Sequence, residues 1–393
     1  MIESGTIIIT EIDDVEIALE EFQRQMPRLR KNSVGIVSVH SDYFETGVYD
    51  AIVELLPFPV LGTTTISQSS AGVTEMYLLS ILVLTSDDCV FATGVSDEIP
   101  QEGDVTDVTA SCYNRLKAEL PGPNKLSLLF VPLMTNHYSY KYVSVMTGID
   151  GNVPVFGTIS NEEAHLENGV VALSGYTLYG AEKYTNRLVM LLISGDITPR
   201  FYLASIGVGD VVLPQIGQVT KSNGNIVQEI NGVRAGDFFN SYGYSVGDTT
   251  SAGLLISTLL IDHVSINGTT RKVGRALYRI QNGDGMCLSN VPEGSIISIA
   301  YATPESVMAT TRQVIRDIKQ SHSGGTALIY SCMGRRYALL SKPLQEFMYV
   351  ADELKDGYNY MAAYSNGEVC PVTVDENCAD NQEHNHTIVA CIL

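Results

Sequence analysis

The chain has 393 residues, of which 45% are apolar, enough for two or three domains with substantial cores. Its 44 Asp and Glu residues against 24 Lys and Arg residues give a formal net charge of −20, which repels nucleic-acid backbones and anionic lipid surfaces, and its apolar runs are too short to span a bilayer. Seven scattered cysteines without a CxxC pair indicate free thiols in a reducing compartment, so we expect a soluble cytoplasmic protein without nucleic-acid or membrane partners.

Two similar patterns follow one another in the N-terminal half. In each, a nearly continuous apolar run predicts a strand buried on both faces, a helical stretch follows, and two further strands complete a unit. The strands are predicted at residues 34–41, 59–66 and 78–86 in the first unit and at 126–133, 154–161 and 188–195 in the second. Both second strands carry the text Pro-Val-apolar-Gly-Thr, which puts Gly62 and Gly157 in register and predicts an internal repeat.

A third unit is predicted at the C-terminus. Its strands lie at 326–333 and 360–368, with a helix at 343–354 between them and a last strand in TIVACIL. The position of the two repeated glycines falls here on the Ser-Asn-Gly of residues 365–367, so the third match rests on the pattern alone.

A different region lies between the second and third units. An Asn-Gly pair at 223–224 predicts a hairpin turn, residues 234–243 a short helix, and the alternating segment 276–302 a second hairpin. A long amphipathic helix at 304–320 then leads into the third unit. We place a domain boundary near residue 214.

These patterns predict an α/β fold with mixed β-sheets, crossover helices and a β-α-β-β unit used three times. Further strands at 89–95 and 200–207 are expected as antiparallel neighbours. We expect two domains, residues 1–213 with two units and residues 214–393 with the hairpins and the third unit.

Known catalytic motifs are absent from the sequence. It has no G-x-S-x-G nucleophile elbow, no phosphate loop and no H-E-x-x-H zinc helix. His384 and His386 form the one close histidine pair, and strand alternation would point both to one face. Such a pair could bind a metal or begin an exposed polar strand, and we predict no metal site and no catalytic residue.

The segment Ser-Cys-Met-Gly-Arg-Arg at 331–336 ends a buried strand with two arginines in a chain poor in positive charge. Arg335 and Arg336 could bind a carboxylate or phosphate, or form internal ion pairs, and the sequence leaves both open. Cys332 beside them is either a reactive or a structural thiol. Glu368 follows a glycine and could meet a ligand amine or pair with the arginines.

Several segments together resemble the FIST domain family. Those similar to its C-terminal domain are SCMGRR, SNGEVCP and NHTIVACIL. Those similar to its N-terminal half are VLGTTTISQSSAGV, VPVFGTISNEEA and LISGDITPRFYLASIG, and VTKSNGNIVQEINGVRA is similar to the link between the halves. The resemblance runs from about residue 30 to the C-terminus.

FIST proteins are regarded as intracellular sensory modules, alone or joined to kinases, cyclases and chemotaxis domains, and are proposed to bind small ligands such as amino acids. The resemblance implies a sensor that binds a small amino-acid-like molecule and signals to a separate partner, such as a histidine kinase, a cyclase or a chemotaxis component. Two departures, Thr65-Ile66 in place of Ala-Gly and an acidic insertion at 375–382, touch the expected ligand region, so the ligand class could differ.

We expect the ligand in a crevice where the carboxyl edges of the repeated units meet. Threonine and asparagine side chains would form hydrogen bonds to it, Arg335 and Glu368 would grip its opposite charges, and the repeated glycines would either admit it or serve folding alone. The predicted ligand-binding residues are Gly62, Thr63, Thr64, Gly157, Thr158, Asn161, Cys332, Arg335, Arg336, Glu368 and Asn385.

Two alternative functions stay open. Some FIST proteins are described as haem proteins that sense nitric oxide, which makes haem a possible cofactor, bound without a CxxCH motif through an unassigned histidine. The weaker alternative is an enzyme that uses Cys332 as nucleophile, since no base or oxyanion site can be placed.

Overall fold

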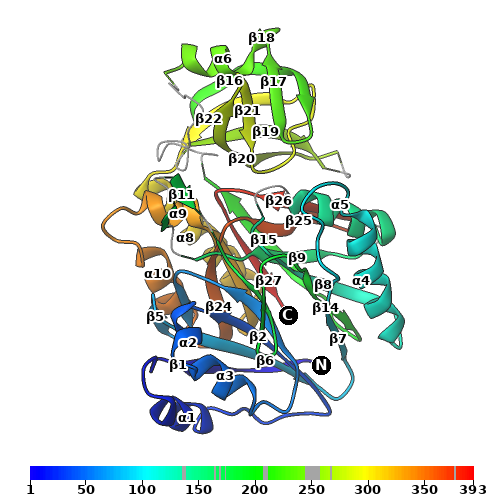
Figure 1. The fold of residues 1–393 in the computed structure, drawn as a ribbon, viewed down its shortest axis with the longest axis vertical. Helices are drawn as coiled ribbons and strands as arrows, with labels where there is room; N and C mark the ends of the chain where they lie inside the picture. Colours follow the sequence, from blue (N-terminus) through cyan, green and yellow to red (C-terminus); the bar gives the residue numbers. More distant parts are fainter. Residues whose placement is uncertain are drawn as a thin grey trace.

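The computed structural model describes residues 1–134, 139–162, 165–167, 170–172, 174–206, 211–243, 257–265, 268–375 and 378–393. The chain forms a body of β-sheets with helices around it, and a smaller β-domain at one end of the body (Figure 1). Within the described residues, no helix is long and apolar enough to cross a membrane.

Three six-stranded sheets with one common strand order make up the body. The first sheet runs β1 (Glu3–Ile9), β6 (Leu79–Ser86), β2 (Asn32–Val39), β3 (Val60–Thr64), β12 (Thr177–Tyr179), β13 (Glu182–Tyr184). The second sheet runs β7 (Val90–Val95), β14 (Val189–Ser194), β8 (Asn124–Val131), β9 (Val155–Ile159), β25 (Glu368–Val374), β26 (Ala379–His384). The third sheet runs β15 (Arg200–Ser205), β27 (Thr387–Ile392), β23 (Gly325–Cys332), β24 (Tyr358–Ser365), β4 (Gln68–Ser70), β5 (Val73–Glu75).

Strand directions repeat as well. In every sheet the third and fourth strands of this order are parallel, and all other neighbours are antiparallel. The chain therefore contains a first unit from β1 to β6, a second from β7 to β14 and a third from β15 to β27. The predicted α/β class, with mixed sheets and a β-α-β-β unit used three times, is confirmed.

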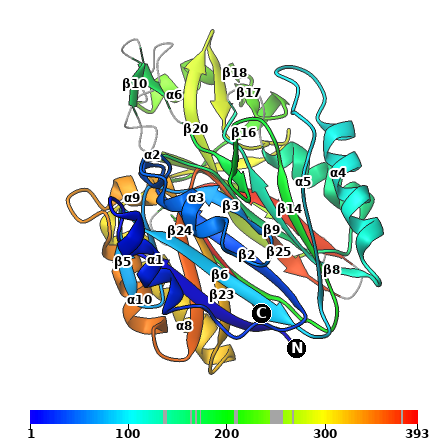
Figure 2. The ribbon, with the colours of Figure 1, turned by 60° about the horizontal axis from the view of Figure 1, so that its bottom comes forward.

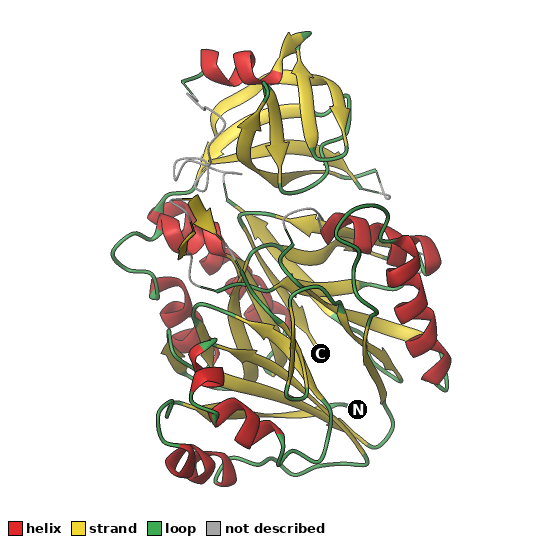
Figure 3. Ribbon diagram, viewed as in Figure 1, coloured by secondary structure: helices red, strands yellow, loops and turns green. Residues whose placement is uncertain are grey.

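Helices cover the outer faces of the sheets (Figures 2 and 3). They are α1 (Val15–Gln23), α2 (Asp42–Glu45) and α3 (Val48–Val53) in the first unit, α4 (Thr106–Glu119) and α5 (Ser139–Ile149) in the second, and α8 (Pro304–Ser321), α9 (Met333–Ala338) and α10 (Gln345–Leu354) in the third. Each outer face packs with its own helices in a separate apolar cluster. The inner faces meet in one common core, to which the sheets contribute residues such as Leu61, Phe156 and Tyr330.

Local sequence sets where these helices begin. At α8, Thr303 Oγ1 accepts a hydrogen bond from Ser306 N (3.1 Å), and Ser306 Oγ accepts one from Thr303 N (2.9 Å). Pro304 follows at the first helical position, where its missing N–H leaves no hydrogen bond unmade. This cap fixes the start of α8, which packs against the third sheet. The sequence predicts this helix at 304–320.

The hairpin that follows the parallel pair of each unit joins the sheet of a different unit. Hairpin β4–β5 of the first unit extends the third sheet beside β24, β12–β13 of the second extends the first sheet beside β3, and β25–β26 of the third extends the second sheet beside β9. The three exchanges form a closed cycle, which we call the cyclic hairpin exchange. As a result, every sheet of the body contains strands from two units.

The β-domain (residues 211–301) is inserted between β15 and α8. Its sheet runs β16 (Val211–Asn223), β22 (Ile296–Tyr301), β19 (Ser257–Val264), β20 (Thr270–Gln281), β21 (Asp284–Cys287), β17 (Ile226–Ile230), β18 (Val233–Arg234), and pairing of β16 with β17 closes the sheet on itself. Helix α6 (Ala235–Ser241) adds Phe238 and Phe239 to its core. Strands β10 (His165–Glu167) and β11 (Val170–Ala172) pair with each other and form a separate two-stranded sheet.

The first hairpin of the β-domain turns one residue later than predicted. Asn223 still pairs with Ile226, so the turn residues are Gly224 and Asn225 rather than residues 223 and 224. Gly224 has the positive φ of 60° that such a turn needs. The predicted boundary near residue 214 falls inside β16.

Gly62 and Gly157 occupy equivalent places, each in the second strand of a parallel pair. A Cβ atom on Gly62 would overlap Val37 O of β2, and one on Gly157 would overlap Leu129 O of β8. The close approach of the neighbouring strand therefore accounts for both glycines as residues required by the fold.

In the third unit the register gives this position to Ala362. Thr63, Thr158 and Ala363 each lie opposite the first residue of an exchanged hairpin, so the residue before each of them is equivalent. The sequence match to the Ser-Asn-Gly of residues 365–367 was wrong, because it aligned the glycines with the turn that follows β24 instead of with the strand itself.

Gly62→Ala and Gly157→Ala should each lower the free energy of unfolding by about 3 kcal/mol, because the new methyl group meets main-chain oxygen that cannot move without breaking the sheet. Urea unfolding measures the loss. Gly148→Ala, in α5 with nothing within 4 Å of the new atom, is the matched control and should be neutral or stabilising. Equal behaviour of all three variants would contradict the argument.

Candidate functional site

The three units meet where the chain leaves β3, β9 and β24 for another sheet. Main-chain hydrogen bonds link the crossing segments, from Asn161 N to Thr64 O (3.2 Å), from Asn366 N to Ile159 O (3.1 Å) and from Tyr364 N to Ser67 O (3.2 Å). We call this region, residues 63–68, 158–161 and 364–368, the crossover centre. It lies at the carboxyl edges of the parallel strands, where the sequence predicts the ligand.

Several predicted polar residues meet in the crossover centre. Thr64 Oγ1 accepts a hydrogen bond from Tyr176 N (2.9 Å), and Asn161 Oδ1 accepts one from Ile66 N (2.9 Å). Asn161 is buried, and its Nδ2 has no hydrogen-bond partner. The predicted residues brought together here are Thr63, Thr64, Thr158, Asn161 and Glu368, with Thr158 directly opposite Glu368 across the β9–β25 pair.

Arg335 is fully buried in an internal ion pair. Its Nη2 lies 2.6 Å from Glu346 Oε1 of α10, and its Nε donates to Ser331 Oγ (3.0 Å). Its Nη1 donates to Thr310 Oγ1 of α8 (2.9 Å), so all three nitrogens of the guanidinium are engaged. Of the two alternatives that the sequence leaves open, the geometry favours the internal ion pair, which fastens α8 and α10 to α9.

Arg336 and Cys332 are the other predicted residues of this segment. Arg336 Nε donates to Ser67 Oγ (3.2 Å), which places its side chain at the crossover centre. Cys332 is buried, and burial, followed by the nearby charge of Glu368, raises the pKa of its thiol above the ordinary value. The thiol is therefore protonated at neutral pH and is not activated as a nucleophile.

Glu368 is the most unusual residue of the crossover centre. It is 0% exposed, and neither of its carboxyl oxygens has a hydrogen-bond partner. Burial raises the pKa of the carboxyl well above its ordinary value, against the opposing influence of Arg335. A buried carboxyl without partners carries a substantial free-energy cost, which a complementary group would relieve.

The β-domain contacts the body at residues 380–386. Asn385 Oδ1 accepts a hydrogen bond from Ala276 N (3.1 Å), Arg275 Nη1 donates to Glu383 O (3.1 Å), and His263 Nε2 lies 2.9 Å from Asp380 Oδ2. Asn385 therefore serves the junction of the two parts, next to the crossover centre.

The carboxyl of Glu383 joins the body at the same junction. Its Oε2 accepts a hydrogen bond from Tyr140 N (2.7 Å) at the start of α5. Burial raises the pKa of Glu383 to about 7, although Ser139 and Arg275 favour the charged form. Its proton is therefore exchanged near neutral pH.

The sequence predicts that His384 and His386 point to one face of a strand, but in the structure they do not share a strand. His384 ends β26 and His386 lies in the turn before β27 with a φ of 53°. The prediction was wrong because the alternation of a strand stops at a turn. Among the residues that the structure describes, no group of three or more His, Cys, Asp or Glu side chains is placed to hold a metal ion.

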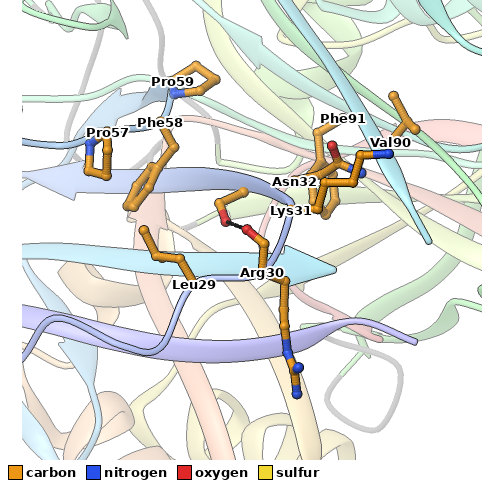
Figure 4. A pocket seen from close by; sticks show the side chains of 10 residues that line it. Leu29, Arg30, Lys31, Asn32, Pro57, Phe58, Pro59, Val90 and Phe91 are labelled. Carbon is orange, nitrogen blue, oxygen red and sulfur yellow. Dashed lines mark hydrogen bonds between the residues drawn. The ribbon is translucent and has the colours of Figure 1, made fainter. Parts of the chain in front are cut away.

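A pocket of about 330 Å³ lies at the amino ends of β2 and β3, the opposite end of these strands from the crossover centre (Figure 4). It is lined by Leu29, Arg30, Lys31, Asn32, Ser33, Pro57, Phe58, Pro59, Val90 and Phe91. None of these side chains is a His, Cys, Met or Tyr, the usual axial ligands of haem iron. The pocket is separate from the predicted site.

Histidines elsewhere are engaged in other contacts. The pairs are His40 with Asp42 (3.4 Å), His263 with Asp380 (2.9 Å), His322 with Tyr202 (2.9 Å) and His384 with Cys370 O (2.9 Å). His137 lies outside the described residues. The haem hypothesis therefore gains no support from these four histidines.

Sequence reasoning missed Gln68, Glu346 and Glu383. Glu346 gave a readable signal, because it precedes Val350 and Leu354 by four and eight residues and so shares the buried face of their helix. Gln68 and Glu383 gave none, since their partners come from other units or from the β-domain.

Comparison with known families assigns both halves of the chain. The family model described as the FIST N domain matches residues 33–233, and the one described as the FIST C domain matches residues 239–371. No curated protein matches the chain.

Glu346→Gln should lower the free energy of unfolding by roughly 3 to 5 kcal/mol, because it leaves the buried Arg335 charge uncompensated. Chemical denaturation measures the loss. Glu353→Gln on the same helix breaks the more exposed pair with Lys319 and should cost less than about 1 kcal/mol. Similar losses for the two variants would contradict the structural role of Arg335.

Glu383 should make stability fall as pH rises. The folded state holds its proton up to about pH 7, whereas the ordinary pKa is 4.5, so between these values the folded state binds one proton more. The free energy of unfolding should therefore decrease by about 3 kcal/mol over this window and level off above it.

Urea unfolding of wild type and Glu383→Gln at several pH values across that window measures this effect. The variant should lose this part of the pH dependence, while Glu54→Gln, at an exposed position, should keep it. Identical pH profiles for wild type and Glu383→Gln would refute the assignment.

Proposed function

The chain belongs to the FIST family, whose N and C domains it carries in that order, and we propose that it is a sensory protein that binds a small molecule at the crossover centre. FIST domains are associated with sensory signal transduction. The observation that carries the proposal is the fully buried, unpartnered carboxyl of Glu368 at the place where all three units meet. A bound molecule would supply the missing partner.

The ligand in this proposal is small and amino-acid-like. The unpartnered Nδ2 of Asn161 is a hydrogen-bond donor and the carboxyl of Glu368 is an acceptor when ionised, so the crossover centre presents groups for both ends of such a molecule. Arg335 is left out, because its three nitrogens already serve Glu346, Ser331 and Thr310.

The signal passes to a separate protein in this proposal. The described elements of these 393 residues belong to the three units, to the small sheet of β10 and β11 or to the β-domain. A histidine kinase, a cyclase or a chemotaxis component would receive it. We propose a cytoplasmic location, which the seven free cysteines support.

A thermal-shift screen of amino acids and related metabolites tests the function. A ligand at 100 times its dissociation constant should raise the free energy of unfolding by about 2.7 kcal/mol. Thr158→Val, which removes a hydroxyl opposite Glu368, should weaken the response, whereas Glu353→Gln on the outer surface of α10 should respond as wild type does. A screen in which no compound stabilises the wild-type protein would reject the proposal.

A further inference from the structure

The cyclic hairpin exchange places three different residues in one structural position. Gln68, Thr177 and Glu368 are each the first residue of an exchanged hairpin. Their partners across the strand pair are Ala363, Thr63 and Thr158, respectively, which are themselves equivalent. All three side chains are buried, so the three positions can be compared directly.

At two of the positions the side chain donates to main-chain carbonyl groups of its own unit. Gln68 Nε2 donates to Ser38 O (3.0 Å), at the end of β2, and to Leu78 O, just before β6. Thr177 Oγ1 donates to Arg187 O (2.8 Å), shortly before β14. At both positions the side chain thus serves as a hydrogen-bond donor to carbonyl oxygens at strand ends.

Glu368 occupies the third position without meeting this need. Cys332 at the end of β23 and Thr387 at the start of β27 are its neighbours: Glu368 raises the pKa of the Cys332 thiol, and the main-chain N–H of Thr387 favours the charged form of Glu368. By register, Thr387 corresponds in the third unit to Leu78, which Gln68 reaches in the first. A carboxyl group has at most one hydrogen to donate, fewer than the amide of Gln68 offers, and neither oxygen of Glu368 has a hydrogen-bond partner.

We propose that Glu368 binds the ammonium group of the ligand, which takes the place that the amide of Gln68 fills in the first unit. The inference rests on the proposed function and names the group that the site recognises. An ammonium group has three hydrogens, enough to donate to the carboxylate of Glu368 and to the carbonyl oxygens of the strand ends.

The carboxyl group of an amino acid is then not required for binding. Arg335, the side chain expected to hold it, is committed to Glu346 at 2.6 Å. Amines without a carboxyl group should therefore still bind, whereas compounds with a blocked amine should not.

Binding has a proton balance that can be measured. Burial raises the pKa of the Glu368 carboxyl well above its ordinary value, so the empty site favours the protonated form, whereas an ammonium partner favours the carboxylate. Binding of a protonated amine should therefore release protons to solvent. No bond within the ligand is made or broken.

The test compares matched compounds on the full chain. For each amino acid of the screen, the corresponding decarboxylated amine and the N-acetyl amino acid are measured in parallel, with ethylammonium chloride and tetramethylammonium chloride as minimal probes. Amino acids, amines and ethylammonium should raise the melting temperature, and N-acetyl compounds and tetramethylammonium should not. Calorimetry in buffers of different ionisation enthalpy should show proton release on binding.

The outcomes separate this inference from the proposed function. Stabilisation by N-acetyl amino acids but not by amines would overturn the ammonium site and leave the sensor intact. A response to tetramethylammonium equal to that to ethylammonium would also overturn it, since that ion carries the charge without an N–H donor. No stabilisation by any compound would reject both.

Two substitutions exchange the chemistry of equivalent positions. Glu368→Gln supplies the donor itself, as Gln68 does, so the variant should melt higher than wild type without ligand and lose at least tenfold in amine affinity. Gln68→Glu should melt lower and regain stability with ethylammonium. Glu368→Asp keeps the acid and should retain a weakened response. A Glu368→Gln variant that melts lower and still responds to amines would contradict the proposal.

Discussion

Each sheet of the body is completed by a hairpin from another unit, and the rest of the structure depends on this cyclic exchange. The common core can form only when all three sheets face one another, and their order is fixed by where β4, β12 and β25 pair. These pairings join segments far apart in the chain, so their loop-closure entropy is met late in folding. We therefore expect the three units to fold cooperatively rather than one by one.

The same exchange explains why the middle of the molecule is polar. Strands that end inside the structure leave carbonyl and amide groups that water cannot reach, and such groups need partners. Thr64, Asn161 and Gln68 supply these partners from their side chains. Glu368 differs from these three because neither oxygen of its carboxyl has a hydrogen-bond partner. The proposed ligand site rests on this difference.

The strands and crossover helices could be predicted from the sequence because they depend on local patterns. The apolar runs at 34–41 and 126–133 and the repeated Gly-Thr text gave two units correctly. The destination of each hairpin could not be predicted, since Gln68 carries no sign that it pairs beside β24. For the same reason Arg335 stayed ambiguous, because its acid is identified only once α10 is folded against α9.

The cyclic hairpin exchange has a consequence for the two domains by which the family is recognised. Hairpin β4–β5 lies in the N-terminal match but pairs with β24, a strand of the C-terminal match. Conversely, β25–β26 begins in the C-terminal match but pairs with β9, a strand of the N-terminal match. If the chain were cut between the two matches, β9 in the N-terminal part and β24 in the C-terminal part would each lose a neighbouring strand. Both exposed strand edges could then pair with another chain. The two matches divide the sequence, but neither completes its sheets alone, so the whole body folds as one unit.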